Sequence, residues 1–242
     1  MRTLTSKGLV GFSPILLFAS SAACATKAVP PIAGYFPPNA GEYVQVVQAD
    51  GTVRSPADRA AYAAADLGAY GKILAVVGAP PLFPQTQAES YRLTIAGAFE
   101  NLVMWIERTA AGWSFVAALA PPVPSEFRFV RGARAERLIS DSDGEEIARG
   151  FSAAGMWKAG FREVKADDRV SVDLPLWLFE GSSKTRYSFA AYEFPLDRIR
   201  DGGGEQALKL GKRLAQLLPA GFLTEFQAGT LGLRGARDAG VR

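Results

Sequence analysis

Short apolar runs that end at glycine or proline follow one another along the middle of the chain. These runs predict strands over 43–47, 91–95, 102–107 and 113–119, with one or two more between 127 and 139. Residues 99–106 also fit helical spacing, but their β-branched and aromatic side chains favour a strand. The middle of the chain is therefore expected to form a sheet.

The clearest hairpin in the sequence lies between 173 and 194. Residues 181–184, with the sequence GSSK, are the predicted loop. This register places one apolar set of side chains on a face that should pack on helices: Leu174, Leu176, Leu178, Tyr187, Phe189 and Ala191. The other face receives Trp177, Phe179, Arg186 and Ser188. Pro175 indicates that the first strand starts near a sheet edge.

Three segments carry helix signals. Ser55 can cap a helix that begins at Pro56 and should end near Gly68 or Gly71, so that 72–77 fits a separate short strand. Two further helices are predicted, one with a capping box at Ser142 and Glu145 that runs to about Met156, and one from near Gly204 to Pro219. Their inward positions are Ile147, Ala148, Phe151 and Ala154 in the former, and Ala207, Leu210, Leu214 and Leu217 in the latter.

These elements predict an α+β fold, in which a mainly antiparallel sheet of hairpins is packed by two or three helices. We expect a single domain over 42–219. The preceding stretch, 24–41, is rich in proline and predicts an extended tether. The last stretch, 220–242, has glycine and arginine but little to bury, which is typical of a flexible basic tail.

Residues 1–23 have the pattern of an export signal. Two basic residues are followed by an apolar run, 8–19, which is shorter than the roughly 20 residues of a membrane-spanning helix. Small residues then lead to Cys24, and the stretch 21–24 (SAAC) resembles a bacterial lipobox, with Ser21 where leucine is usual. The resemblance implies that Cys24 becomes a lipidated N-terminus. Ordinary signal cleavage around Ala23 or Ala25, which would give a soluble periplasmic protein, is the alternative.

Composition narrows the possible chemistry. The 242-residue chain has no histidine and one cysteine, so it cannot form a Ser-His-Asp triad, a Cys-His pair or an internal disulfide. The formal net charge is +3, but without 1–23 the 27 basic residues fall to 25, against 24 acidic ones. A nearly neutral mature chain is not expected to bind nucleic acid. No cofactor motif is present in the sequence, and none is predicted.

From residue 89 onward the order of elements resembles a family of uncharacterised bacterial exported proteins and lipoproteins. The resemblance rests on the stretches ESYRLTI, LISDSDGEEIARGFSAAGMW and LWLFEGSSKTRYSFAAYEFP. Within the last stretch, Trp177, Glu180 and Tyr187 match a Trp-x-x-Glu strand and a following tyrosine strand. The resemblance implies the architecture and no catalytic residue.

Three groups of residues are candidates for chemistry. Trp177, Glu180 and Tyr187 could bind a sugar or a cation, although Glu180 could also pair with Lys184 or Arg186 while the aromatic residues pack. The acids Asp141, Asp143, Glu145 and Glu146 could serve a glycosidase, but helix capping explains them better. The arginines Arg128, Arg131, Arg134 and Arg137 could meet anionic groups, but a spacing of three on a strand alternates their faces.

The sequence therefore predicts an envelope lipoprotein, held on a membrane by its lipid, that works as a non-enzymatic binding or interaction module. An envelope protein or a cell-wall polymer is the expected partner, and the oligomeric state is left open. The alternative is a carboxylate-dependent hydrolase of cell-wall polymer with Glu180 as its acid. A small-molecule carrier with a pocket beneath the hairpins is a third possibility.

Overall fold

The computed structural model describes residues 35–37, 46–47, 56–84, 88–123, 128–157, 160–162, 175–193, 196 and 203–234. The predicted signal peptide, Cys24 and residues 235–242 lie outside this part of the chain. Within it, no helix is long and apolar enough to cross a membrane.

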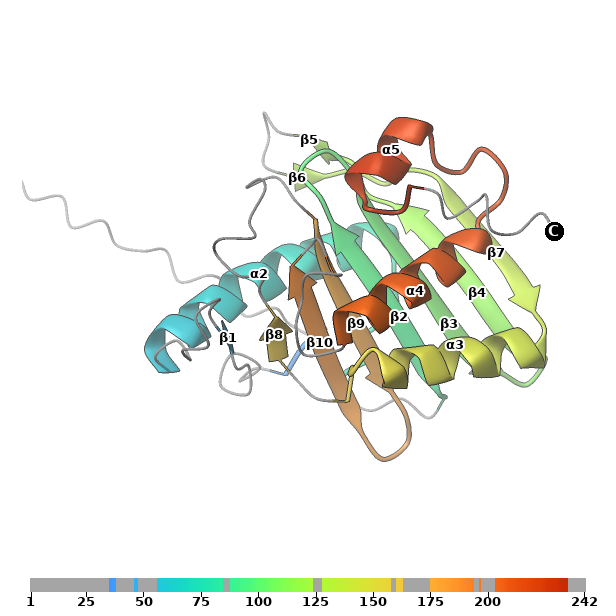
Figure 1. Ribbon diagram of the computed structural model, residues 1–242, viewed down its shortest axis with the longest axis horizontal. Coiled ribbons are helices and arrows are strands. Elements are labelled where there is room, and N and C mark those ends of the chain that lie inside the picture. Colours follow the sequence, from blue (N-terminus) through green and yellow to red (C-terminus); the bar gives the residue numbers. More distant parts are fainter. Residues whose placement is uncertain are drawn as a thin grey trace, which may run out of the picture.

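The domain is built on one large sheet (Figure 1). Its strands are, in spatial order, β1 (Val46–Val47), β8 (Gly160–Arg162), β10 (Tyr187–Glu193), β9 (Leu176–Ser182), β2 (Ser90–Ala96), β3 (Asn101–Thr109), β4 (Gly112–Leu119) and β7 (Arg134–Ile139). The strands from β10 to β7 are antiparallel, whereas β8 and β1 add on in parallel. Two short strands, β5 (Pro122–Val123) and β6 (Arg128–Phe129), pair separately. The predicted α+β class with a mainly antiparallel sheet is confirmed.

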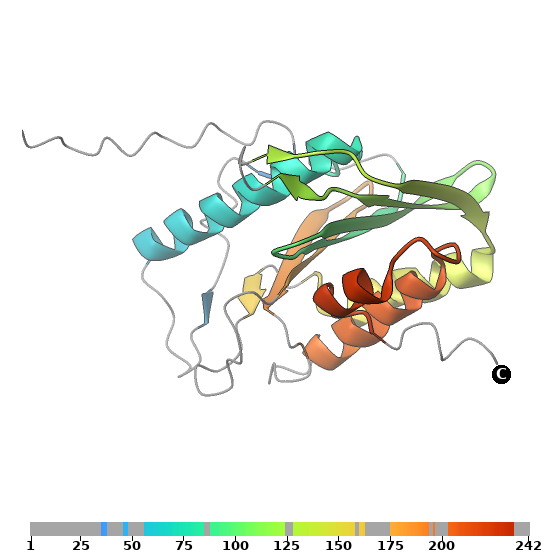
Figure 2. The same ribbon diagram turned by 90° about the horizontal axis from the view of Figure 1, so that it is seen from above.

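Helices cover both faces of the sheet, as the edge-on view shows (Figure 2). One face packs against α2 (Pro56–Val77). The other packs against α3 (Asp141–Ala153) and α4 (Gly203–Gln216), with the short helix α5 (Glu225–Thr230) beside them. Because neither face meets water, the central strands are buried along most of their length.

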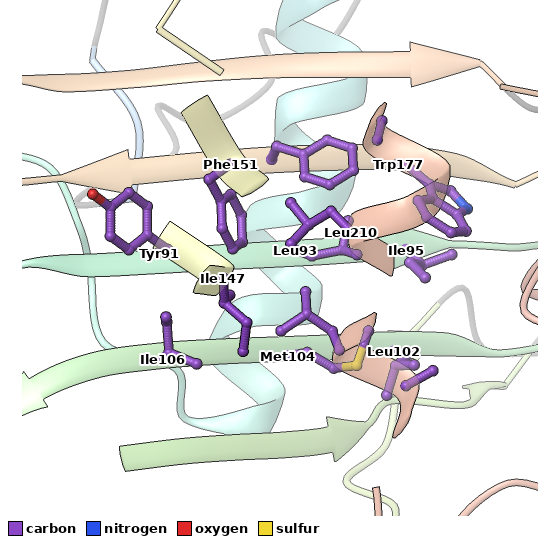
Figure 3. Packing of buried hydrophobic residues seen from close by; sticks show 14 of the residues in the cluster. Tyr91, Leu93, Ile95, Leu102, Met104, Ile106, Ile147, Phe151, Trp177 and Leu210 are labelled. Carbon is purple, nitrogen blue, oxygen red and sulfur yellow. The ribbon is translucent and has the colours of Figure 1, made fainter. Parts of the chain in front are cut away.

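The larger core fills the space between the sheet and the α3–α4 pair (Figure 3). Side chains from β2, β3 and β9 point toward this layer and meet those of the two helices: Tyr91, Leu93, Ile95, Leu102, Met104, Ile106 and Trp177 from the strands, and Ile147, Phe151 and Leu210 from the helices. The predicted inward positions of α3 and α4 are all buried, which confirms the two amphipathic faces.

Glycines let these two helices approach the sheet closely. A Cβ atom on Gly144 of α3 would lie 2.2 Å from the ring of Trp113, and one on Gly211 of α4 would lie 2.0 Å from the ring of Trp177. Each tryptophan therefore fits under a helix at a position where any larger residue would collide with it.

The predicted end of the first helix is wrong. Helix α2 passes through Gly68 and Gly71 and continues to Val77, so that 72–77 is helical and not a strand. Each glycine costs a helix about 1 kcal/mol relative to alanine. The cost is offset because the last part of the helix buries one apolar face on the sheet, namely Leu67, Tyr70, Ile73, Leu74 and Val77.

The start of α3 and the hairpin loop also differ from the prediction. Ser140, not Ser142, caps α3, and its hydroxyl accepts a hydrogen bond from the Asp143 N–H at 3.1 Å; the helix ends at Ala153, before Met156. The β9–β10 loop comprises 183–186 instead of 181–184. This moves the turn by two residues, so the predicted faces are preserved.

The domain is longer than predicted at both ends. Phe36, which falls within the predicted tether, is buried against Phe189 of the sheet. At the other end, Leu231 and Leu233 are buried in the larger core, and α5 starts with a capping box formed by Thr224 and Gln227. The expectation that a flexible tail begins at 220 is therefore wrong for 220–234, because these two leucines provide the apolar surface that orders the segment.

Candidate functional site

Glu180, the acidic member of the predicted binding group, lies in the middle of β9. Its register partner on β2 is Arg92. The two side chains form a bidentate ion pair, with Nε to Oε2 at 2.7 Å and Nη2 to Oε1 at 2.8 Å, and both are 0% exposed. A fully enclosed pair of this geometry is a structural brace between two strands.

Two further contacts complete the network around this ion pair. The Tyr187 hydroxyl donates to Glu180 Oε1 at 3.0 Å. Burial raises the pKa of Tyr187 well above its usual value, and the charge of Glu180 raises it further. The Nη1 group of Arg92 donates to the carbonyl of Pro80 at 2.6 Å, which ties the segment after α2 to the sheet. The polar atoms of the pair are thus well satisfied.

The predicted trio of Trp177, Glu180 and Tyr187 is only partly brought together. Trp177 is buried on the opposite face of the sheet, in the larger core, so it does not contribute to a site with the other two. The expected alternative partners of Glu180, Lys184 and Arg186, are also wrong, because Arg92 occupies that role. The sequence signal that could have revealed Arg92 is a lone charge inside the apolar strand YRLTI.

An open pocket of about 430 Å³ lies beyond this brace, at the loop end of the β9–β10 hairpin. Its lining comes from three neighbouring segments: Ala88 and Glu89 before β2, Arg108 near the end of β3, and Ser183, Lys184 and Thr185 of the loop. The β9–β10 loop is the orange loop at the lower edge of Figure 1. The sequence did not single out Glu89 or Arg108, since only strand pairing brings them beside the loop.

Short-range contacts hold two of the charged side chains of this pocket, Arg108 and Glu89, in place. Arg108 Nη1 donates to Glu145 Oε1 of α3 at 2.7 Å, and its guanidinium lies 5.5 Å from the centre of the Trp113 ring. The Tyr91 hydroxyl donates to Glu89 Oε1. Burial raises the pKa of Tyr91 above its usual value, and this hydrogen bond raises it further. Glu89 and Arg108 are therefore fixed by neighbouring side chains, while the pocket remains open to solvent.

No family model matches this chain, and no curated protein is similar to it.

The resemblance to uncharacterised exported lipoproteins thus stays a prediction. The part of the chain that the structure describes contains no group of three or more acidic, cysteine or histidine side chains placed to hold a metal ion.

The acidic group at the start of α3 joins elements of the fold. Asp143 and Glu146 both contact Arg213 of α4, and Ser140 together with Arg213 lowers the pKa of Asp143 against the opposing effect of burial. With Glu145 bound to Arg108, three of the four predicted acids link α3 to a neighbouring element. These contacts support the capping and pairing interpretation of the acids over the glycosidase interpretation.

Two of the four spaced arginines meet the end of α2. Arg131 Nε donates to the Val76 carbonyl at 3.1 Å, and Arg134 Nη1 donates to the Val77 carbonyl at 3.4 Å. A cation at a helix C-terminus is favourable because the last carbonyls carry partial negative charge. These two side chains thus have a structural role at the C-terminal end of α2.

Proposed function

We propose that this protein is an exported lipoprotein of the cell envelope that binds its ligand in the pocket at the β9–β10 loop. The observation that carries the binding role is the pocket itself: three segments meet around an open space with two cations and one carboxylate on its walls. Its volume falls within the range of about 300–1,000 Å³ that is usual for small-molecule sites. The pattern of residues 1–24 supports export and anchoring at the periplasmic face of a membrane.

The burial of Glu180 supports a non-enzymatic role over the hydrolase alternative. A glycosidase needs two carboxyl groups about 5–9 Å apart that both reach the substrate. Glu180 is enclosed on all sides, and both of its oxygens accept hydrogen bonds from Arg92. Because this side chain is 0% exposed, a polymer could not reach it in the folded domain.

The anchor is tested by labelling cells with a radioactive or alkyne fatty acid and measuring the intact mass of the purified chain. We expect the wild-type chain to start at Cys24 and to carry acyl chains, and Cys24→Ala to lose the label and leave the membrane fraction. Ser21→Leu, which creates the usual lipobox residue, is the matched control and should keep the label. An intact Met1 start with a free Cys24 thiol would contradict the proposal.

The binding role is tested by pull-down from solubilised envelope fractions with the tagged full-length chain. We expect the wild type to enrich a discrete ligand or partner that Lys184→Glu fails to enrich, since this change reverses one charge of the pocket. Lys72→Glu is the control, because Lys72 is an exposed residue of α2 on the other side of the sheet. Equal recovery with the wild type and Lys184→Glu would argue against this pocket as the binding site.

A further inference from the structure

The charges in the pocket follow the order of three neighbouring strands. Glu89 immediately precedes β2, Arg108 is near the end of β3, and Lys184 lies in the loop that follows β9. Since β2 lies between β9 and β3, the carboxylate sits between the two cations. Strands are spaced about 4.8 Å apart, so the two outer backbones are about 10 Å apart.

Each of these three side chains keeps unused hydrogen-bonding capacity. Glu89 uses Oε1 for the Tyr91 hydroxyl, and Arg108 uses Nη1 for Glu145. Glu89 Oε2 and the Nε and Nη2 groups of Arg108 form no side-chain hydrogen bond within the described ranges. Lys184 forms no ion pair or hydrogen bond with any residue in the part of the chain that the structure describes. A ligand can therefore find both a free acceptor and free cationic donors here.

A ligand with charge of one sign alone fits this arrangement poorly. Glu89 would repel a simple anion, and the two cations would repel a simple cation. A molecule with an ammonium and a carboxylate meets an opposite charge at both ends. The hydroxyls of Ser183 and Thr185, 3.5 Å apart at the rim, can bond to polar groups between those ends.

From this juxtaposition we infer that the pocket binds a small peptide-like zwitterion, with its ammonium at Glu89 and its carboxylate at Lys184. This inference rests on the proposed binding role of the pocket and specifies its ligand. The pocket volume of about 430 Å³ suits a short peptide.

The ligand class is tested by calorimetric titration of the full-length chain in detergent with four matched peptides. These are trialanine, N-acetyl-trialanine, trialanine amide and N-acetyl-trialanine amide, which carry both charges, the negative charge, the positive charge and neither. We expect trialanine to bind at least tenfold more tightly than each capped form. Equal binding of all four, or binding of none, would overturn the inference.

Single substitutions in the pocket assign each charge to its partner. With Glu89→Gln, we expect N-acetyl-trialanine to bind as well as trialanine, because the ammonium has lost its partner. With Lys184→Met, trialanine amide should approach trialanine in affinity. Lys72→Met, on the other side of the sheet, should leave all four affinities unchanged. Unaltered selectivity in both pocket variants would also overturn the inference.

The two proposals can fail separately. If none of the peptides binds but Lys184→Glu still abolishes the envelope pull-down, the pocket is the binding site and the zwitterion is the wrong ligand class. If the pull-down is the same with and without Lys184→Glu and no peptide binds, both the binding role of this pocket and the ligand inference are wrong.

Discussion

Glu180→Gln is expected to lower the free energy of unfolding by about 3–5 kcal/mol, the range for breaking one side of a buried ion pair. The reason lies in the partner that remains. Arg92 is 0% exposed and its guanidinium cannot lose a proton in a protein, so its charge would stay buried without a carboxylate. A total stability of about 5–15 kcal/mol is usual for a domain, so this loss is a large fraction of it.

The measurement is urea denaturation of the full-length chain followed by far-UV circular dichroism. Glu205→Gln is the matched control, because Glu205 is an exposed partner of Lys209 and its pair is worth little. The double variant Arg92→Met with Glu180→Met removes both charges at similar volume and should be more stable than Glu180→Gln alone. A loss below about 1 kcal/mol in Glu180→Gln would show that the ion pair does not stabilise the pairing of β2 and β9 as proposed.

Trp177→Ala is expected to cost a similar amount, about 3–5 kcal/mol, because it leaves a cavity in the larger core. The Trp177 ring is fully buried and its outer edge faces Gly211 of α4, where a Cβ atom would come within 2.0 Å. Removing the ring leaves a gap between the sheet and α4, the helix that packs against α3. The same denaturation experiment measures the loss.

Gly211→Ala provides the test of the mechanism. Alone, it should cost about 1–3 kcal/mol through overpacking against the ring. Combined with Trp177→Ala, the added methyl group enters empty space, so the two losses should sum to more than the loss of the double variant. Trp157→Ala is the control for removal of a tryptophan, since Trp157 is only partly buried and should cost less. Strict additivity in the double variant would mean that the two residues do not contact each other.

Local features of the sequence predicted β2, β3, β4, β9 and β10, the two amphipathic helices and the sharing of faces in the hairpin. They did so because side-chain spacing of two in a strand and 3.6 in a helix is a property of the backbone alone. The error at α2 came where a distant contact decides, because the sheet supports the last turns of this helix past two glycines. The error at α3 was local, since Ser140 and Ser142 both have the residue type of an N-cap and Ser140 takes that position.

The hairpin shows the same division. Its faces were predicted correctly, but its loop was placed two residues too early, because GSSK has the composition of a turn. In the folded chain Gly181 lies in β9, where a Cβ atom would come within 2.3 Å of Met156. The contact requires a glycine inside the strand, and no local pattern shows it.

By itself, the sequence determined the class of the fold, the absence of histidine chemistry and the pattern that predicts export and lipidation at Cys24. Only the tertiary structure decided that Glu180 is a buried partner of Arg92, that Trp177 lies on the other face, and that Glu89 and Arg108 meet the loop at Lys184. The physical reason is that local composition and spacing set which side of an element is apolar. Charges far apart in the chain meet only through strand order and register, which depend on the packing of all elements together.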